Sequence, residues 1–182
     1  GAAVTIVLTE GEPKTDDAAR MLHLARSMEL PVFSFEEQPE AVNEALEQVD
    51  VIVDAIYGSG FHGEMDVRRR QITEKINSAI AAVFSLDGPS GINCDTGEAA
   101  QDAVNADFTI AFDSYKTAHL LPKYLPQLGQ VTLGSIGIDP LAYEKIPFDH
   151  FVADEEYVYS RIPQRQPDAH KTSTGKLLNI SG

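Results

Sequence analysis

The apolar and polar positions of the chain follow two recurring patterns, short apolar runs and longer amphipathic stretches. Residues 4–8, 32–35 and 51–53 are short apolar runs rich in β-branched or aromatic side chains, which predict buried strands. Between these runs the apolar residues recur every three or four positions, which predicts helices with one buried face. The first predicted face comprises Ala18, Met21, Leu22, Ala25 and Met28, and the second comprises Val42, Ala45, Leu46 and Val49.

Two polar or rigid residues predict where these helices begin. Thr15 is a suitable N-cap, and Asp16 and Asp17 follow it in the first turn, where the helix dipole favours carboxylates. Pro39 fits the first position of the second helix, because its backbone nitrogen has no hydrogen to leave unpaired. We therefore expect helices to start at these two places.

The second half of the chain continues the alternation. Ile72, Ile76 and Ile80 predict the buried face of a third helix. The remaining predicted strands are residues 82–86, residues 108–112, and a closing strand at 131–133 and 136–138 interrupted by Gly134. Continuous apolar strands alternating with amphipathic helices predict an α/β fold, a Rossmann-like three-layer sandwich with a mostly parallel sheet and helices on both faces.

Composition narrows the class of protein. With 14 basic and 28 acidic side chains the net charge is −14, which argues against binding to nucleic acid or to an anionic membrane surface. The single cysteine, Cys94, excludes an intramolecular disulfide framework. No run approaches the roughly 18 apolar residues of a transmembrane helix. We expect a cytoplasmic domain.

The candidate chemistry lies at the predicted carboxyl ends of the strands, where open parallel sheets bind their ligands. Asp54 and a glycine-rich loop follow one strand, Asp87 follows the next, and Lys116 follows a third. The loop is suited either to holding a phosphate or to an ordinary strand-to-helix turn. Asp54 and Asp87 are either turn carboxylates or site residues, and their oxygens suit a hard cation better than zinc.

Other polar residues carry weaker signals. Lys116 is suited to pairing with a phosphate or a carboxylate, and the alternative is a solvated surface lysine. His62 and His119 have no metal-ligand spacing to another histidine, and a direct role is the less favoured interpretation for each. Ser90 does not lie in the Gly-x-Ser-x-Gly motif of a serine hydrolase. Cys94 has no obvious base partner and is interpreted as structural.

Two motifs together resemble a known family. Residues 51–60 read Val-Ile-Val-Asp-Ala-Ile-Tyr-Gly-Ser-Gly, and residues 87–97 read Asp-Gly-Pro-Ser-Gly-Ile-Asn-Cys-Asp-Thr-Gly. In order and spacing they resemble the YjeF N-terminal domain, the NAD(P)H-hydrate epimerase, over roughly residues 4–139. The resemblance implies that the substrate is NADHX or NADPHX, a nicotinamide cofactor hydrated at C6. The family's reaction interconverts the R and S epimers at that carbon.

The same resemblance implies roles for individual residues. It implies Asp54 and Ser90 as ligands of a potassium ion, and Asp87 as a substrate contact. Epimerisation requires a proton to be delivered and removed at C6, and we assign this acid–base step to Asp87 with Lys116 assisting. The implied substrate-binding loop comprises Gly58, Ser59, Gly60, Phe61, His62, Gly63 and Glu64.

The resemblance also implies the domain organisation. Residues 1–148 correspond to a YjeF N-terminal domain without the family's first strand and its Asn-Asn-Gly-Gly-Asp loop, which do not occur in these 182 residues. Residues 149–167 are interpreted as a linker. Residues 168–182 resemble the start of a ribokinase-like, ADP-dependent NAD(P)H-hydrate dehydratase domain, for which ADP or ATP would be the cofactor. A homo-oligomer is expected.

Two alternative functions remain open from the sequence. In the first alternative, the main activity of the parent protein is ADP-dependent dehydration. In the second, this domain is a non-catalytic module for nucleotide binding or protein interaction. The absent asparagine loop favours the non-catalytic module, whereas the intact Asp87 and Ser90 favour the enzyme.

Overall fold

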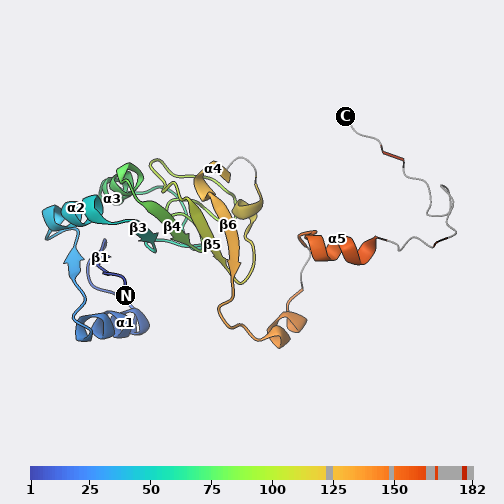
Figure 1. The fold of residues 1–182 in the computed structure, drawn as a ribbon, viewed down its shortest axis with the longest axis horizontal. Coiled ribbons are helices and arrows are strands. Elements are labelled where there is room, and N and C mark those ends of the chain that lie inside the picture. The colour runs from blue at the N-terminus through green and yellow to red at the C-terminus, as the bar shows by residue number, and fades with distance from the viewer. Residues whose placement is uncertain (122–124, 148–149, 163–166, 168–177, 180–182) are drawn as a thin grey trace. The chain divides into compact units, whose positions relative to one another are not determined.

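The chain divides into two compact units, Gly1–Ile138 and Asp139–Gly182. The computed structural model describes residues 1–121, 125–147, 150–162, 167 and 178–179. Every strand that it describes lies in the first unit (Figure 1).

The first unit begins with a small parallel sheet. Strand β1 (Ile6–Leu8) pairs in parallel with β2 (Val32–Ser34), and helix α1 (Asp16–Ser27) connects them. The side chain of Thr15 accepts a hydrogen bond from the Ala18 N–H at 3.4 Å, which confirms the predicted N-cap. Pro39 begins the next helix, α2 (Pro39–Gln48), also as predicted.

A second parallel sheet follows, with four strands in the order β3-β4-β5-β6. Its elements in chain order are β3 (Val51–Asp54), α3 (Val67–Ser78), β4 (Ala82–Leu86), β5 (Phe108–Phe112), the 3₁₀ helix η1 (Thr117–Leu120), α4 (Leu125–Leu128) and β6 (Gln130–Gly134). Neighbouring strands all run in the same direction. Parallel strands with helices around them confirm the predicted α/β class.

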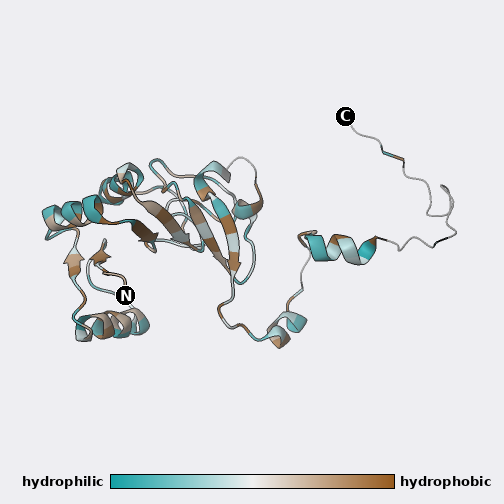
Figure 2. Cartoon of the chain, in the orientation of Figure 1, coloured by the Kyte–Doolittle hydropathy of each residue, from teal (hydrophilic) through white to brown (hydrophobic). Residues whose placement is uncertain are grey.

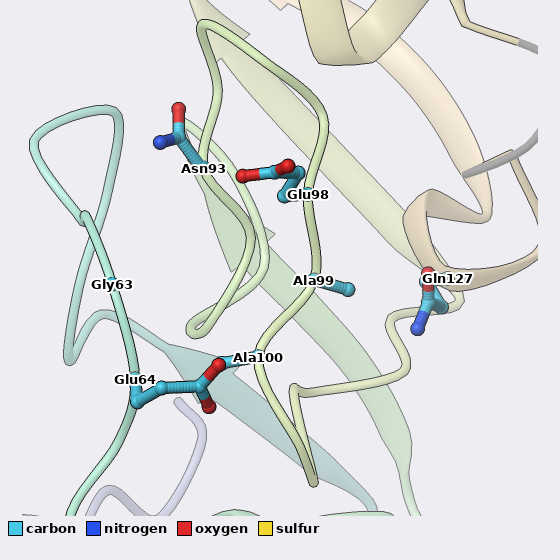
Figure 3. A pocket seen from close by; sticks show the side chains of 7 residues that line it. All are labelled: Gly63, Glu64, Asn93, Glu98, Ala99, Ala100 and Gln127. Atoms are coloured by element: carbon cyan, nitrogen blue, oxygen red, sulfur yellow. The ribbon is translucent and has the colours of Figure 1, made fainter.

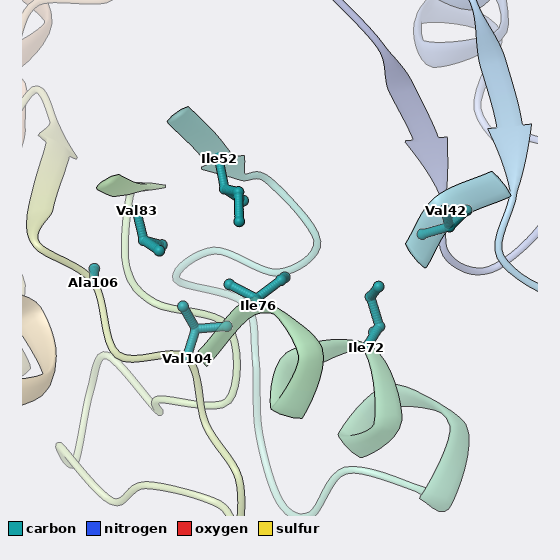
Figure 4. Close-up of a cluster of buried hydrophobic side chains, with 7 residues drawn as sticks. All are labelled: Val42, Ile52, Ile72, Ile76, Val83, Val104 and Ala106. Carbon is teal, nitrogen blue, oxygen red and sulfur yellow. The ribbon is translucent and has the colours of Figure 1, made fainter. Parts of the chain in front are cut away.

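The core lies where α3 packs on one face of the four-stranded sheet. Ile72 and Ile76 of α3 face Ile52 and Val83 of the sheet, and Val104 closes the cluster (Figure 4). Each of these five is less than a tenth exposed, and full burial of such a side chain contributes about 2 kcal/mol relative to exposure. Figure 2 shows hydrophobic residues concentrated in the strands and hydrophilic residues along α2 and α3.

The sheet differs from the prediction of one continuous buried layer. β1 and β3 are not paired, so the strands form two sheets. A groove of about 150 Å³ between these strands is lined by Val7 and Thr9 on one side and by Ile52 and Val53 on the other. Only alternate residues of β3 are buried, because Val51 and Val53 project from the face opposite α3 and remain half exposed.

The closing strand is also shorter than predicted. β6 ends at Gly134, which pairs with Phe112 at the end of β5, and residues 136–138 are not part of a strand. The strand stops there because its partner strand has ended. At the other end, Gly129 has φ +60°, and a Cβ added there would lie 2.1 Å from the Asp107 carbonyl oxygen, so only glycine fits this turn.

The described part of the second unit contains two short helices. The 3₁₀ helix η3 (Pro140–Lys145) is capped by Asp139, and α5 (Glu155–Arg161) is capped by Asp154. The predicted linker at 149–167 therefore contains a helical segment. The predicted dehydratase start at 168–182 lies outside the described residues except at 178 and 179, and that prediction stays untested. Within the described ranges, no helix is long and apolar enough to cross a bilayer.

Candidate active site

The carboxyl ends of β3, β4 and β5 meet at one edge of the sheet because the three strands are parallel neighbours. Asp54 is the last residue of β3, Asp87 follows β4 directly, and Lys116 lies four residues beyond the end of β5. The structure brings two of these groups into contact: the Lys116 Nζ lies 2.5 Å from the Asp87 Oδ1. The candidate site is built around this pair.

Three donors converge on the carboxylate of Asp87. Oδ1 accepts the ammonium of Lys116 and the Phe112 N–H at 3.1 Å, and Oδ2 accepts the Ser59 N–H at 3.3 Å. The residue is 9 % exposed. Its backbone has φ +64°, a left-handed conformation that is strained for a residue with a side chain, and such strain concentrates at functional sites.

These contacts determine the ionisation of Asp87. Burial raises the pKa of this carboxyl, but the hydrogen bonds from Lys116, Ser59 and Phe112 and the lysine charge outweigh it and lower the pKa to about 2. Asp87 is therefore a carboxylate at neutral pH. In this form the carboxylate has no proton to donate and acts only as a proton acceptor, so another group must be the proton donor of the site.

Lys116 is held by two acceptors. Its Nζ donates to the Asp87 carboxylate and, at 2.7 Å, to the Phe112 carbonyl oxygen at the end of β5. The side chain is 22 % exposed, so it is only partly buried. This placement excludes the alternative of a freely solvated surface lysine. The backbone of Phe112 thus contacts both charged groups, a role that the sequence pattern did not indicate.

His119 is a further site residue, although its sequence context favoured no direct role. It is 3 % exposed, and its two ring nitrogens lie 3.0 Å from the backbone nitrogen of Lys116 and 3.0 Å from the backbone oxygen of Asp87. Burial lowers the pKa of this imidazole. The available signal was the spacing of three residues after Lys116, because Lys116 is the N-cap of η1 and His119 lies in its single turn.

The first part of the predicted substrate loop approaches Asp87. A Cβ added to Gly58 would lie 3.4 Å from the Asp87 Cβ, so the absence of a side chain keeps the space above the carboxylate open. Ser59 donates its backbone N–H to that carboxylate. Gly60 is exposed, with open space around it. Phe61 is buried beside Met65 and anchors the loop in a small hydrophobic cluster.

The second part of the loop borders a separate cavity. Gly63 and Glu64 line a pocket of about 580 Å³ together with residues from the loop after β4 (Figure 3). His62 is exposed, and its Nδ1 lies 3.2 Å from the Nδ2 of Asn93. Neither Asp87 nor Lys116 lines this pocket. The seven predicted loop residues therefore do not all lie at the Asp87–Lys116 pair, because the second part of the loop borders a different pocket. The pocket is lined by Gly63, Glu64, Asn93, Glu98, Ala99, Ala100 and Gln127.

Asp54 and Ser90, the predicted potassium ligands, are in direct contact. Oδ1 of Asp54 accepts the Ser90 hydroxyl at 2.6 Å and the Ile56 N–H at 3.3 Å. Oδ2 accepts the Ser90 N–H at 2.8 Å and the Ser85 hydroxyl at 2.9 Å. Asp54 is 1 % exposed. The carboxylate thus joins the loop after β3 to the loop after β4.

This arrangement does not fit a potassium ion as it stands. A carboxylate has about four acceptor positions, and these four hydrogen bonds occupy them. An ion bound to Asp54 would have to displace one. Among the described residues, no group of three or more His, Cys, Asp or Glu side chains is placed to hold a metal ion. The potassium ligands stay a prediction.

Cys94 behaves as a packing residue. Its side chain is buried, and burial raises the pKa of the thiol to about 11, so it is a neutral thiol at physiological pH. A Cβ added to Gly88 would lie 2.7 Å from the Cys94 sulfur. The glycine after Asp87 therefore lets the sulfur pack against the backbone of the site.

Comparisons with known proteins point to one family. The family described as YjeF-related protein N-terminus matches residues 1–118. The chain is 33% identical over 165 residues to the bifunctional NAD(P)H-hydrate repair enzyme Nnr of Coxiella burnetii, covering 91% of this chain and 33% of that protein. It is 33% identical over 137 residues to the enzyme of the same name from Escherichia coli, covering 75% and 26%.

A solved structure supports the same fold. The crystal structure of yeast ynu0, YNL200c, matches with a TM-score of 0.58 and 22% identity, covering 79% of this chain and 60% of that chain. The chain spans a quarter to a third of the length of the two curated relatives. On the family match and these relatives, the chain belongs to the YjeF N-terminal family.

Proposed function

We propose that this domain is an NAD(P)H-hydrate epimerase, which interconverts the R and S epimers of NADHX and NADPHX. The observation that carries the proposal is the Asp87–Lys116 pair, an ionised carboxylate and an ammonium in direct contact beyond the ends of parallel strands. The names of the relatives, bifunctional NAD(P)H-hydrate repair enzymes, support the same substrate.

The first half of the proposed reaction removes the C6 hydroxyl group. The Lys116 ammonium donates a proton to this oxygen as the C6–O bond breaks, and the group leaves as water. The electron pair of that bond leaves with the oxygen. The positive charge that remains on C6 is shared with the ring nitrogen N1, and the neighbouring Asp87 carboxylate stabilises it electrostatically.

The second half adds water to the opposite face of the ring. Asp87 accepts a proton from this water as the new C6–O bond forms. The proton then passes from Asp87 to the neutral amine of Lys116 along their direct hydrogen bond, which restores the starting charges. One water leaves and one water adds, so the balance requires no oxidant or reductant. No step uses a potassium ion.

A coupled assay tests this function. The chain is mixed with the R epimer of NADHX and an excess of an S-specific dehydratase, and the recovery of absorbance at 340 nm is followed. We expect recovery faster than the background, and a loss of about 100-fold or more in Asp87→Asn and Lys116→Met, since positioned acid–base groups contribute about 10²–10⁴-fold. Asp95→Asn, which removes an exposed carboxylate from the same loop, is the matched control.

The outcomes separate the alternatives. Recovery at the background rate by the folded chain would contradict epimerase activity and favour a non-catalytic module. If the full-length protein restores NADH from the S epimer with ADP or ATP but does not use the R epimer, dehydration is its main activity. Replacing potassium by sodium in the same assay tests the potassium prediction.

A further inference from the structure

His119 connects two loops that carry the charged pair. One ring nitrogen contacts the peptide of Asp87 after β4, and the other contacts the peptide of Lys116 after β5, each at 3.0 Å. The ring is 3 % exposed, and its neighbour Tyr115 packs edge-on at 6.3 Å between ring centres. A single buried side chain therefore links the backbones of both groups to which we assign the chemistry.

The identity of the two partners determines the tautomer of the imidazole. The Lys116 backbone N–H only donates, so the Nδ1 that faces it carries no proton. The Asp87 carbonyl oxygen only accepts, so the Nε2 that faces it carries one. The ring is thus the neutral Nε2–H form. Protonation would place a second hydrogen against the Lys116 N–H and break that contact.

The charged and titratable groups around the ring agree with a neutral form. Burial is the largest effect and lowers the pKa of His119, and the nearby ammonium of Lys116 acts in the same direction. The Asp87 carboxylate and the backbone contact to Asp87 act in the opposite direction but do not outweigh burial. The Cys94 thiol, whose Sγ lies 3.9 Å from the same Asp87 oxygen, is also uncharged at neutral pH.

Both peptides need this support. Asp87 has φ +64°, which is strained for a residue with a side chain. Its N–H donates to the Ile110 oxygen at 2.8 Å, and its carbonyl accepts from His119, so hydrogen bonds fix the peptide groups on both sides of the strained residue. Lys116 is the N-cap of the short helix η1, and the N–H groups at a helix start have no partner within the helix.

We propose that His119 is the positioning residue of the site: as a neutral Nε2–H imidazole it ties the peptide of Asp87 to that of Lys116 and so sets the contact between the carboxylate and the ammonium. The kinetic consequence rests on the proposed epimerase function. The tautomer and the two hydrogen bonds do not, so they are testable without any activity.

Two substitutions separate the two contacts. In His119→Asn the amide oxygen takes the place of Nδ1 and keeps the acceptor for Lys116, but the donor to Asp87 is lost. In His119→Gln the amide nitrogen takes the place of Nε2 and keeps the donor, but the acceptor is lost. His23→Asn changes an exposed histidine on α1 and is the control for the substitution itself.

The kinetic result expected is a fall in kcat with little change in KM. We expect kcat to fall about tenfold in His119→Asn, because the net free energy of one hydrogen bond corresponds to a rate change of about that size. KM should stay within about twofold, and His23→Asn should have unchanged kinetics. The pKa of Asp87, followed through its side-chain carbon by NMR, is expected to rise above about 2 in both His119→Asn and His119→Gln, because each variant loses one of the two contacts that tie Asp87 to Lys116. Wild-type kcat in both histidine variants would overturn the proposal.

Nitrogen NMR of the histidine-labelled wild-type chain tests the tautomer directly. We expect the coupling pattern of an Nε2–H imidazole for His119 at pH 7, and this measurement is independent of how well the variants fold. An Nδ1–H tautomer or a charged ring at that pH would overturn the proposal. If the chain lacks epimerase activity while the tautomer is as stated, the proposed function fails and the positioning of Asp87 and Lys116 stands.

Discussion

The Lys116 ammonium lies 2.5 Å from the Asp87 carboxylate, although 29 residues separate them in the sequence. The pairing follows from topology, since β4 and β5 are parallel neighbours and each residue lies just beyond the end of its strand. The Phe112 backbone fixes the contact by donating its N–H to Asp87 and accepting from Lys116. An acid and a base are thereby placed side by side, and several expectations depend on this geometry.

Removing the ammonium is expected to raise the pKa of Asp87. In Lys116→Met burial continues to raise this pKa while the largest opposing contact is lost, and the hydrogen bonds from Ser59 and Phe112 remain, so the value should rise from about 2 toward the ordinary 3.8. The measurement is a pH titration of the Asp87 carboxyl carbon by NMR. Lys14→Met, which removes an exposed lysine, serves as the control. An unchanged Asp87 titration in Lys116→Met would show that the lysine does not determine its ionisation.

The same pair makes folding stability depend on pH in the acid range. The pKa of Asp87 is lower in the folded chain than its ordinary 3.8, so its contribution is complete above about pH 4 and is lost as the pH falls toward 2. That contribution corresponds to about 2 kcal/mol. Urea unfolding at a series of pH values measures it, and the Asp87→Asn chain should show a flatter curve. Parallel curves for the two chains would contradict this account.

Asp54 is expected to contribute strongly to the stability of the folded chain. Asp54→Asn replaces one accepting oxygen by an NH₂ group that faces buried donors, which should destabilise the chain by about 3 kcal/mol. Asp50→Asn, at an exposed aspartate just before the same strand, should change stability by no more than about 0.5 kcal/mol. Chemical denaturation compares the two. Equal stabilities would mean that the four hydrogen bonds of Asp54 contribute nothing.

The open space above Asp87 is testable with two glycines of the same loop. Gly58→Val places a branched side chain at the 3.4 Å contact with Asp87, whereas Gly60→Val places it in open space. We expect kcat/KM in the coupled assay to fall about tenfold or more in Gly58→Val and to change little in Gly60→Val. Thermal unfolding of both variants controls for a loss of fold. Equal activities would place the reacting atoms elsewhere.

Much of the local structure follows from the sequence because it depends on neighbouring residues. The helix starts at Thr15 and Pro39 are local features, and the structure has both. The break between β1 and β3 depends on which strands pair, and a run such as residues 51–53 is equally compatible with a buried or a half-exposed strand. The end of β6 at Gly134 likewise depends on where its partner ends.

The site was predictable to a similar extent. The rule that strand ends share an edge indicated Asp87 and Lys116, which the structure brings into contact. It did not indicate His119, because the ring acts on backbone atoms whose positions the sequence does not specify. Nor did it indicate that the oxygens of Asp54 accept hydrogen bonds from Ser85, Ser90 and Ile56, since these donors come from strand β4, the loop after β4 and the loop after β3.

The most direct test of the Asp87–Lys116 mechanism is oxygen exchange at C6. The chain is incubated with the R epimer of NADHX in water enriched in ¹⁸O, and the epimer ratio and the mass of the product are measured together. The mechanism predicts that each inversion introduces one solvent oxygen, and that Asp87→Asn lowers inversion and exchange together. Inversion without ¹⁸O incorporation, or inversion at the wild-type rate in Asp87→Asn, would contradict it.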